Sequence, residues 1–182
     1  YWEWSRRLDW SYYSKGPGVA WAIAASTALF GVAEWSVRLP AAVAGAVTML
    51  ALAMLGLASR RGDWRVGFLA ALIFCLAPGF QAISLLMTID APFIACWGLS
   101  AWAGWHVFRR LEKGDGVTGP AVALGLALGV GFLFKYTILL LVPGFLLFAV
   151  LRRRHLHLGG RQWGGLVIGT AVFAVFTAPV WV

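Results

Sequence analysis

Apolar residues run along this chain in long continuous stretches, separated by short polar or basic segments. A helix that crosses a bilayer needs roughly 20 consecutive apolar residues, whereas the strands of a membrane barrel alternate apolar and polar positions. The runs here are unbroken and rich in Ala, Leu and Val, which predicts an all-α, polytopic transmembrane bundle. We expect about six spans, at approximately 40–59, 66–89, 91–108, 119–134, 137–151 and 164–182.

Turn residues mark where these predicted helices bend and begin. Pro78-Gly79 interrupts the second apolar run and predicts a kink there. Asp90 stands at the start of the third helix, where it could cap the free backbone N–H groups. Lys135 interrupts the apolar region 119–151, which fits either one long span or two short ones.

The basic residues decide between these two alternatives. They gather at 60–65, 109–113 and 152–161, between the apolar runs, which is typical of membrane topology signals and not of a nucleic-acid site. Two short spans place all three clusters on the cytoplasmic side, in agreement with the positive-inside rule, whereas one long span does not. Ten of the 15 Lys and Arg residues then lie inside.

The stretch 1–39 differs from the rest, because charge, aromatic rings and turn residues crowd together in it. Within it, 18–30 is apolar but only about a dozen residues long, so we expect a helix along the membrane surface and not a span. Pro17 would begin this helix and Gly31 would end it. The topology makes 1–39 an extracytoplasmic loop, ahead of a transmembrane bundle over 40–182.

Composition supports the membrane assignment. Of the 182 residues, 61% are hydrophobic and only 12% are charged, and the mean hydropathy is +0.81. Charged residues make up about a quarter of an ordinary soluble domain. The chain starts without Met and stops inside an apolar run, so we expect a piece, truncated at both ends, of a longer inner (plasma) membrane protein.

Three ionisable residues on the predicted outer face are candidates for chemistry. Asp90 is either a helix cap or a carboxylate that points into an extracytoplasmic cavity. Lys15 precedes the rigid Gly16-Pro17 turn and either extends to lipid headgroups or holds a phosphate group. Lys135 either lies in a solvated turn or faces the bundle, where it needs an anionic partner such as Asp90 or a lipid phosphate.

The remaining candidates favour structural roles. Cys75 and Cys96 lie inside apolar runs without the spacing of a metal or redox site, so we interpret them as core residues. Glu34 and Arg38 have the spacing of a solvated ion pair on one helix face. The histidines form no metal-binding motif, and no Gly-rich phosphate loop or nucleotide fingerprint is present. Small residues at four-residue spacing within 121–129 predict close helix packing.

Several short motifs follow one another along the chain. They are Tyr1-Trp2-Glu3-Trp4-Ser5, the stretch 8–17, Val37-Arg38-Leu39-Pro40, Thr88-Ile89-Asp90-Ala91-Pro92 and Phe134-Lys135-Tyr136-Thr137. In this order and at this spacing the set resembles bacterial members of the dolichyl-phosphate-mannose protein mannosyltransferase-like family. These are membrane glycosyltransferases of the GT-C fold, and the aminoarabinose transferases that modify lipid A are relatives. The resemblance covers essentially the whole chain.

This resemblance implies a partial GT-C fold and the inverting transfer of a sugar on the extracytoplasmic side. The donor would be a polyprenyl-phosphate sugar, and the acceptor a hydroxyl group of a lipid, a glycan or a protein. Lys15 would neutralise the donor phosphate, with Tyr12, Tyr13 and Lys135 beside it. Asp90 would orient the acceptor or help to hold a divalent metal, and no residue is assigned as a metal ligand.

The family carries its catalytic base in an Asp-Glu pair just before the stretch that matches Tyr1-Trp2. We therefore expect the base upstream of Tyr1, and the fragment alone to be inactive. Two positions depart from the family pattern. Gly16 replaces a second proline and would loosen the turn, and Ile89 stands where Thr-Pro-Asp is commoner, which leaves the geometry at Asp90 open.

The alternative from another functional class is a transporter or a lipid-handling scaffold without chemistry. A transporter places its ionisable groups near the bilayer midplane, beside broken helices. Here the candidate groups gather at one membrane face, which favours surface chemistry on a lipid headgroup. The sequence identifies neither the sugar nor the acceptor.

Overall fold

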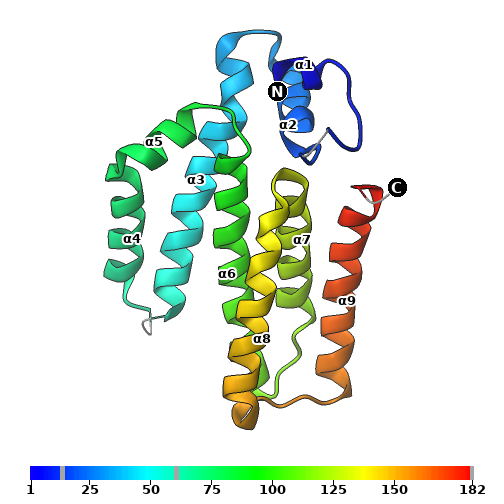
Figure 1. The fold of residues 1–182 in the computed structure, drawn as a ribbon. Helices are drawn as coiled ribbons and strands as arrows, with labels where there is room; N and C mark the ends of the chain where they lie inside the picture. Colours follow the sequence, from blue (N-terminus) through cyan, green and yellow to red (C-terminus); the bar gives the residue numbers. More distant parts are fainter. Residues whose placement is uncertain (13–14, 60–61, 181–182) are drawn as a thin grey trace.

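The computed structural model describes residues 1–12, 15–59 and 62–180 (Figure 1). Helix accounts for 83% of the structure, which confirms the predicted all-α class. An up-and-down bundle is formed by α3 (Glu34–Ser59), α4 (Trp64–Leu76), α6 (Asp90–Lys113), α7 (Thr118–Phe134), α8 (Leu141–Arg152) and α9 (Gly160–Thr177). The short α1 (Trp2–Ser5) and α2 (Gly18–Phe30) lie at one end of this bundle.

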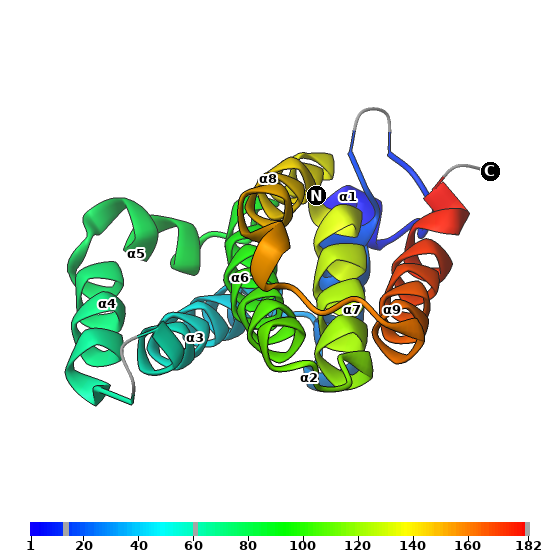
Figure 2. The same cartoon turned by 90° about the horizontal axis from the view of Figure 1, so that it is seen from below.

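Seen along its axis, the bundle is a curved row in which α4, α3, α6, α7 and α9 follow one another, with α8 to one side (Figure 2). The contacts between helices follow the same order. Short 3-10 turns extend α8 at both ends, as η1 (Tyr136–Leu140) and η2 (Arg153–His155), and η3 (Ala178–Val180) follows α9.

One end of the bundle, called the arginine-rich end below, holds the connections α3–α4, α6–α7 and α8–α9. The basic residues described there are Arg65, Arg109, Arg110, Lys113, Arg152, Arg153, Arg154 and Arg161. The predicted cluster members Arg60 and Arg61 lie outside the described residues. At the opposite end α7 stops at Phe134 and the chain turns back into η1 and α8, so the apolar region 119–151 forms two helices.

Among the described residues, two segments are long and apolar enough to cross a membrane, namely α3 and Tyr136–His155. The pair α4 and α5 (Pro78–Leu85) is a third candidate if the two are one broken span. The helices α2 and α7 are apolar but shorter, at 13 and 17 residues. The six-span topology and the membrane-surface position of α2 remain predictions.

The predicted kink at Pro78-Gly79 is present as a complete break between two helices. Ala77 is extended, as expected before a proline, and the axes of α4 and α5 differ in direction by 72°. The amide of Gln81 donates to the carbonyl oxygen of Cys75 at 2.6 Å and so bridges the break. The predicted second run, 66–89, is therefore two helices with different directions.

Several helices extend beyond the apolar runs that predicted them. We expected the third run to stop at Arg109, but α6 continues to Lys113 and ends where Gly114 adopts a left-handed conformation with φ of 74°. The last run was expected from 164, but α9 begins at Gly160, where the side chain of Gln162 accepts from the Gly159 N–H at 3.1 Å. Hydrophobicity indicates where a helix meets lipid, whereas capping determines where the helix ends.

Helix α3 begins at Glu34, ahead of the predicted span 40–59, so Pro40 lies inside the helix. A proline has no N–H, so it leaves the carbonyl group of residue i−4, here Ser36, without its helical partner. The hydroxyl group of Ser26 in α2 donates to this carbonyl oxygen at 2.6 Å, and both serines are buried. This hydrogen bond ties α2 to the beginning of α3.

Replacing Ser26 by alanine is therefore expected to lower the free energy of unfolding by about 1 kcal/mol, since the buried Ser36 carbonyl loses its partner. Thr27→Ala is the matched control, because the Thr27 hydroxyl contacts only carbonyl groups of its own helix. Thermal unfolding of both variants in the same detergent measures the difference. Equal melting temperatures would show that Ser26 does not hold the two helices together.

The interior of the bundle is built from small residues. In the contact between α7 and α9, a methyl group on Gly125 would collide with the carbonyl oxygen of Gly169. A methyl group on Gly169 would in turn collide with Ala121. This confirms the close helix packing predicted for 121–129, and the packing fixes α7 against α9.

Candidate functional site

An ion pair joins the start of α6 to the end of α7, at the end of the bundle opposite the arginine-rich end. The ammonium nitrogen of Lys135 lies 2.9 Å from Oδ1 of Asp90. The same nitrogen lies 5.2 Å from the centre of the Phe93 ring, one turn further along α6. Both charged side chains are more than one third exposed. Of the two alternatives for Lys135, the structure therefore supports the paired one, with Asp90 as its partner.

Asp90 is not a helix cap, which corrects that alternative. Ile89 holds the cap position of α6, and Asp90 is the first helical residue. The Asp90 N–H donates to the hydroxyl oxygen of Thr88 at 3.3 Å, so the threonine supplies the local hydrogen bond. The Asp90 carboxylate is thus available for the tertiary contact with Lys135.

Ile89, which departs from the family pattern, has a packing role. Ile89 is buried in one cluster with Val19 and Ile23 of α2, and this contact fixes the start of α6 against α2. A proline, which is commoner there, has a smaller side chain than isoleucine. The position of Asp90 is therefore defined by apolar packing between the two helices.

The segment that carries Lys15 packs onto the end of α7. Gly16 to Gly18 are buried, and a methyl group on Gly16 would collide with the carbonyl oxygen of Leu133. Because Lys135 follows Leu133 by two residues, this contact brings the Lys15 segment to the same place as the Asp90–Lys135 pair. Gly16 thus permits close packing, which is a different role from the looser turn expected from the sequence.

The Lys15 side chain is half-buried, and its ammonium group makes no hydrogen bond or ion pair with the described parts of the chain. Its backbone is held by two hydrogen bonds with the backbone of Tyr12, of 2.8 and 3.0 Å. The chain then enters α2 directly through Pro17. A lysine with a fixed backbone and an uncommitted charge is well suited to hold an external anion.

Tyr12 has a structural role within the loop. Its hydroxyl group donates to the Arg7 carbonyl oxygen at 2.7 Å and accepts from the Asp9 N–H at 2.7 Å. Its ring stacks on Trp4 at 4.9 Å between centres. Phosphate binding by Tyr12 would require exchange of these bonds. Tyr13, the other predicted phosphate ligand, lies outside the described residues.

The sequence interpretation missed two contributors to this site. Phe93 was passed over because an aromatic residue one turn after Asp90 cannot be distinguished from a core residue by spacing alone. The contact between Gly16 and Leu133 joins positions more than a hundred residues apart, and no local pattern signals it. The only sequence signal for Phe93 is its position three residues after Asp90, which places it on the same helix face but fits a core residue equally well.

The other candidates lie away from this site or make separate contacts. Glu34 and Arg38 form the predicted exposed ion pair on α3. Cys96 is buried whereas Cys75 is exposed, so only Cys96 fits the predicted core position. Over the described ranges, no three His, Cys, Asp or Glu side chains converge as a metal site would require.

Comparison with known proteins gives the family. A match to the family described as dolichyl-phosphate-mannose-protein mannosyltransferase spans residues 14–182. The chain belongs to this family. The motif resemblance seen in the sequence is thereby confirmed, and it includes the segments that carry Lys15, Asp90 and Lys135.

Two curated relatives show how much of a longer protein the chain represents. The chain is 33% identical over 147 residues to the lipid A galacturonosyltransferase RgtD of Rhizobium johnstonii, which is 79% of this chain and 29% of that protein. It is 30% identical over 171 residues to the undecaprenyl phosphate-alpha-4-amino-4-deoxy-L-arabinose arabinosyl transferase of Pseudomonas aeruginosa (strain LESB58), which is 94% of this chain and 30% of that protein. The chain therefore spans less than a third of these relatives.

The fold of this family member matches a solved structure. The crystal structure of ArnT from Cupriavidus metallidurans in the apo state superposes with a TM-score of 0.72 and covers 98% of this chain and 34% of that one, at 22% sequence identity. This likeness confirms the predicted partial GT-C helical fold.

Proposed function

We propose that this chain supplies the donor-phosphate side of a membrane glycosyltransferase. The full protein would move a sugar from a polyprenyl-phosphate donor to an acceptor hydroxyl on the extracytoplasmic side, with inversion at the anomeric carbon. The observation that carries this proposal is the arrangement at one end of the bundle, where the Lys15 turn lies on α7 beside the Asp90–Lys135 pair. The names of the relatives, which include undecaprenyl phosphate and lipid A, support the classes of donor and acceptor.

The charges at this end suit a phosphate-linked donor. Lys15 and Lys135 bring two positive charges and Asp90 brings one negative charge, so one positive charge remains uncompensated. A polyprenyl phosphodiester carries one negative charge before transfer and gains a second when the sugar leaves. Fixed cations beside the leaving oxygen stabilise that developing charge more than they stabilise the intact donor, which is the requirement for catalysis.

The proposed reaction exchanges one bond at the anomeric carbon for another. The acceptor oxygen forms a bond to C1 of the sugar as the bond from C1 to the phosphate oxygen breaks. The acceptor proton passes to a carboxylate base. We place this base in the Asp-Glu pair that the family carries before the stretch matching Tyr1-Trp2. The bonding electrons leave with the polyprenyl phosphate, beside Lys15.

Within this scheme Lys15 is the phosphate ligand and Lys135 is a second cation that Asp90 holds in place. Asp90 would act on the acceptor only where its carboxylate is released from Lys135. The basic clusters lie at the opposite end of the bundle, so the positive-inside rule supports an extracytoplasmic position for Lys15 and Asp90.

Product analysis tests this function. The full-length protein, reconstituted with undecaprenyl phosphate-4-amino-4-deoxy-L-arabinose and lipid A, is expected to release one undecaprenyl phosphate for each glycosidic bond formed. Nuclear magnetic resonance should show that the new bond has the opposite anomeric configuration to the donor. Movement of the intact donor across the membrane without bond exchange would favour the transporter alternative and overturn the proposal.

A further inference from the structure

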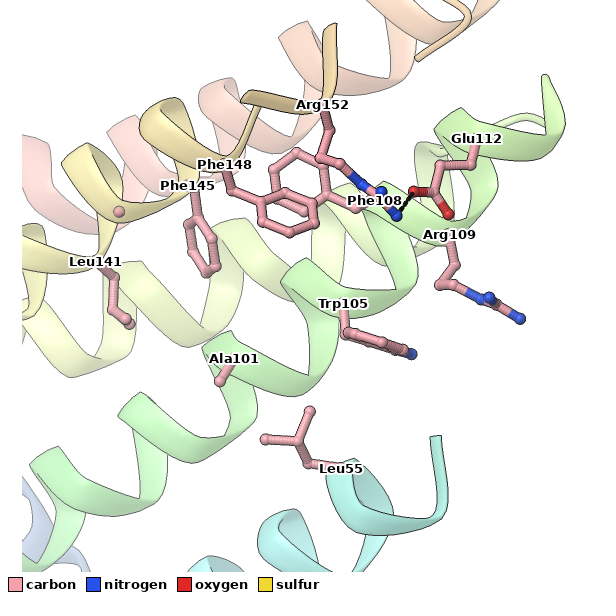
Figure 3. Close-up of a pocket in the computed structure, with 11 residues that line it drawn as sticks. Leu55, Ala101, Trp105, Phe108, Arg109, Glu112, Leu141, Phe145, Phe148 and Arg152 are labelled. Carbon is pink, nitrogen blue, oxygen red and sulfur yellow. Dashed lines mark hydrogen bonds and ion pairs between the residues drawn. The ribbon is translucent and has the colours of Figure 1, made fainter. Parts of the chain in front are cut away.

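A cavity of about 370 Å³ runs between α6 and α8 and reaches Glu112 and Arg152 at the arginine-rich end (Figure 3). Both helices line it with aromatic side chains. Trp105 and Phe108 come from α6, and Phe145 and Phe148 come from α8. Phe108 and Phe148 pack edge to face with ring centres 4.7 Å apart, which gives the cavity a firm aromatic wall. A Cβ atom on Gly104 would collide with the Phe145 ring, so the glycine lets this ring pack closely against α6.

Charged residues line this apolar space only toward the arginine-rich end. Nη2 of Arg152 lies 3.0 Å from Oε1 of Glu112, across from α8 to α6. This contact uses one of the five N–H donors of the guanidinium group. Arg109, also on the lining, is exposed and lies 6.0 Å above the Trp105 ring, and it makes no ion pair within the described ranges. The three charges sum to one uncompensated positive charge.

A second, polar cavity adjoins the first through the shared residues Trp105 and Arg109. It measures about 430 Å³, and its other charged lining residues are Arg110, Lys113 and Asp115, with His106 beside them. Arg110 donates to the Gly116 carbonyl oxygen at 3.0 Å. An apolar cavity thus lies next to a cationic one, at the arginine-rich end of the bundle.

We propose that this pair of cavities binds an anionic phospholipid. One acyl chain lies against the Phe108 and Phe148 wall, and the phosphate lies at the end of the cavity that Arg109 and Arg152 line. The order of the lining residues favours a lipid. Apolar side chains line most of the cavity and cations line its end, just as acyl chains are followed by the phosphate group in a phospholipid. Basic pockets between transmembrane helices are a known mode of recognition for acidic lipid headgroups. A polypeptide segment would instead have to supply a matching carboxylate at the same depth.

Native mass spectrometry of the full-length protein tests this site. The protein is titrated in detergent with dioleoyl phosphatidylglycerol and, separately, with dioleoyl phosphatidylcholine, which has the same chains without net charge. Wild type is expected to bind the anionic lipid more tightly. The double variant Arg109→Gln/Arg152→Gln is expected to weaken binding of phosphatidylglycerol at least about fivefold. Arg153→Gln/Arg154→Gln removes the same charge just outside the cavity and is the matched control.

A cavity-filling variant tests the acyl-chain position separately. Gly144 lines the cavity on α8, and a Cβ atom there would meet nothing within 4 Å, so Gly144→Leu fills the space without disturbing the fold. We expect it to lose the preferred lipid, whereas Gly119→Leu, equally open but on α7, retains it.

Four outcomes would overturn the proposal. The first is equal loss of the lipid in the two arginine double variants, which would indicate general attraction to the basic end. The second is full retention of the lipid by Gly144→Leu, which would indicate another position for the acyl chain. The third is displacement of the lipid by inorganic phosphate, which would indicate an ion site. The fourth is a wild-type protein without preference between the two lipids, which would indicate a cavity filled by another segment of the protein.

Discussion

Replacing Lys15 by alanine in the full-length protein is expected to lower kcat/KM for sugar transfer at least about a hundredfold, with no loss of membrane insertion. Removal of one fixed donor that faces developing negative charge typically costs 100- to 1,000-fold in rate, or about 3 kcal/mol or more of transition-state stabilisation. Lys15 is the candidate for this role because its backbone is fixed and its charge has no partner in the described chain. The measurement is steady-state transfer by reconstituted protein.

The controls separate the role of the Lys15 ammonium group from the general charge of the loop. Arg6→Ala removes an exposed positive charge from the same loop and should leave turnover within about twofold of wild type. Lys15→Arg keeps the charge and should recover part of the lost rate. Wild-type turnover in Lys15→Ala would remove Lys15 from the site and leave lipid-headgroup contact as its role.

Much of the helical framework could be predicted from the sequence, because continuous apolar runs bounded by basic residues leave few arrangements in a membrane. The run 18–30 coincides with α2, and Gly31 ends it with φ of 81° as expected. Helix ends were predicted less well. The apolar pattern does not indicate that α6 continues to Lys113 and ends at Gly114, or that Ser26 compensates for the missing N–H of Pro40.

The candidate site could also be predicted only in part from the sequence. The basic clusters placed Asp90 and Lys135 on one side of the bundle, and the need of Lys135 for an anion made Asp90 a possible partner. The structure shows this pair. The position of Lys15 could not be predicted, because it depends on close packing of Gly16 on Leu133. A sequence without aligned relatives carries no signal for such a contact between distant segments.

Asp90→Asn is expected to lower turnover at least tenfold, which corresponds to about 1.4 kcal/mol of transition-state stabilisation. The physical reason is that asparagine cannot balance the charge of Lys135, which is then no longer held between the carboxylate and the Phe93 ring. Because both charged side chains are more than one third exposed, the free energy of unfolding should change by less than about 1 kcal/mol. Glu34→Gln breaks a more exposed pair at the same end and should leave turnover unchanged.

A double-mutant cycle distinguishes the two ways in which Asp90 could act. If Asp90 serves only to hold Lys135, then Asp90→Asn, Lys135→Met and the double variant should each lose about the same factor, near tenfold. If Asp90 also contacts the acceptor, the losses should multiply toward a hundredfold in the double variant. We expect the first result, because the Asp90 carboxylate lies 2.9 Å from the Lys135 ammonium group in the structure. Unchanged kinetics in Asp90→Asn would reduce this ion pair to a structural link between α6 and α7.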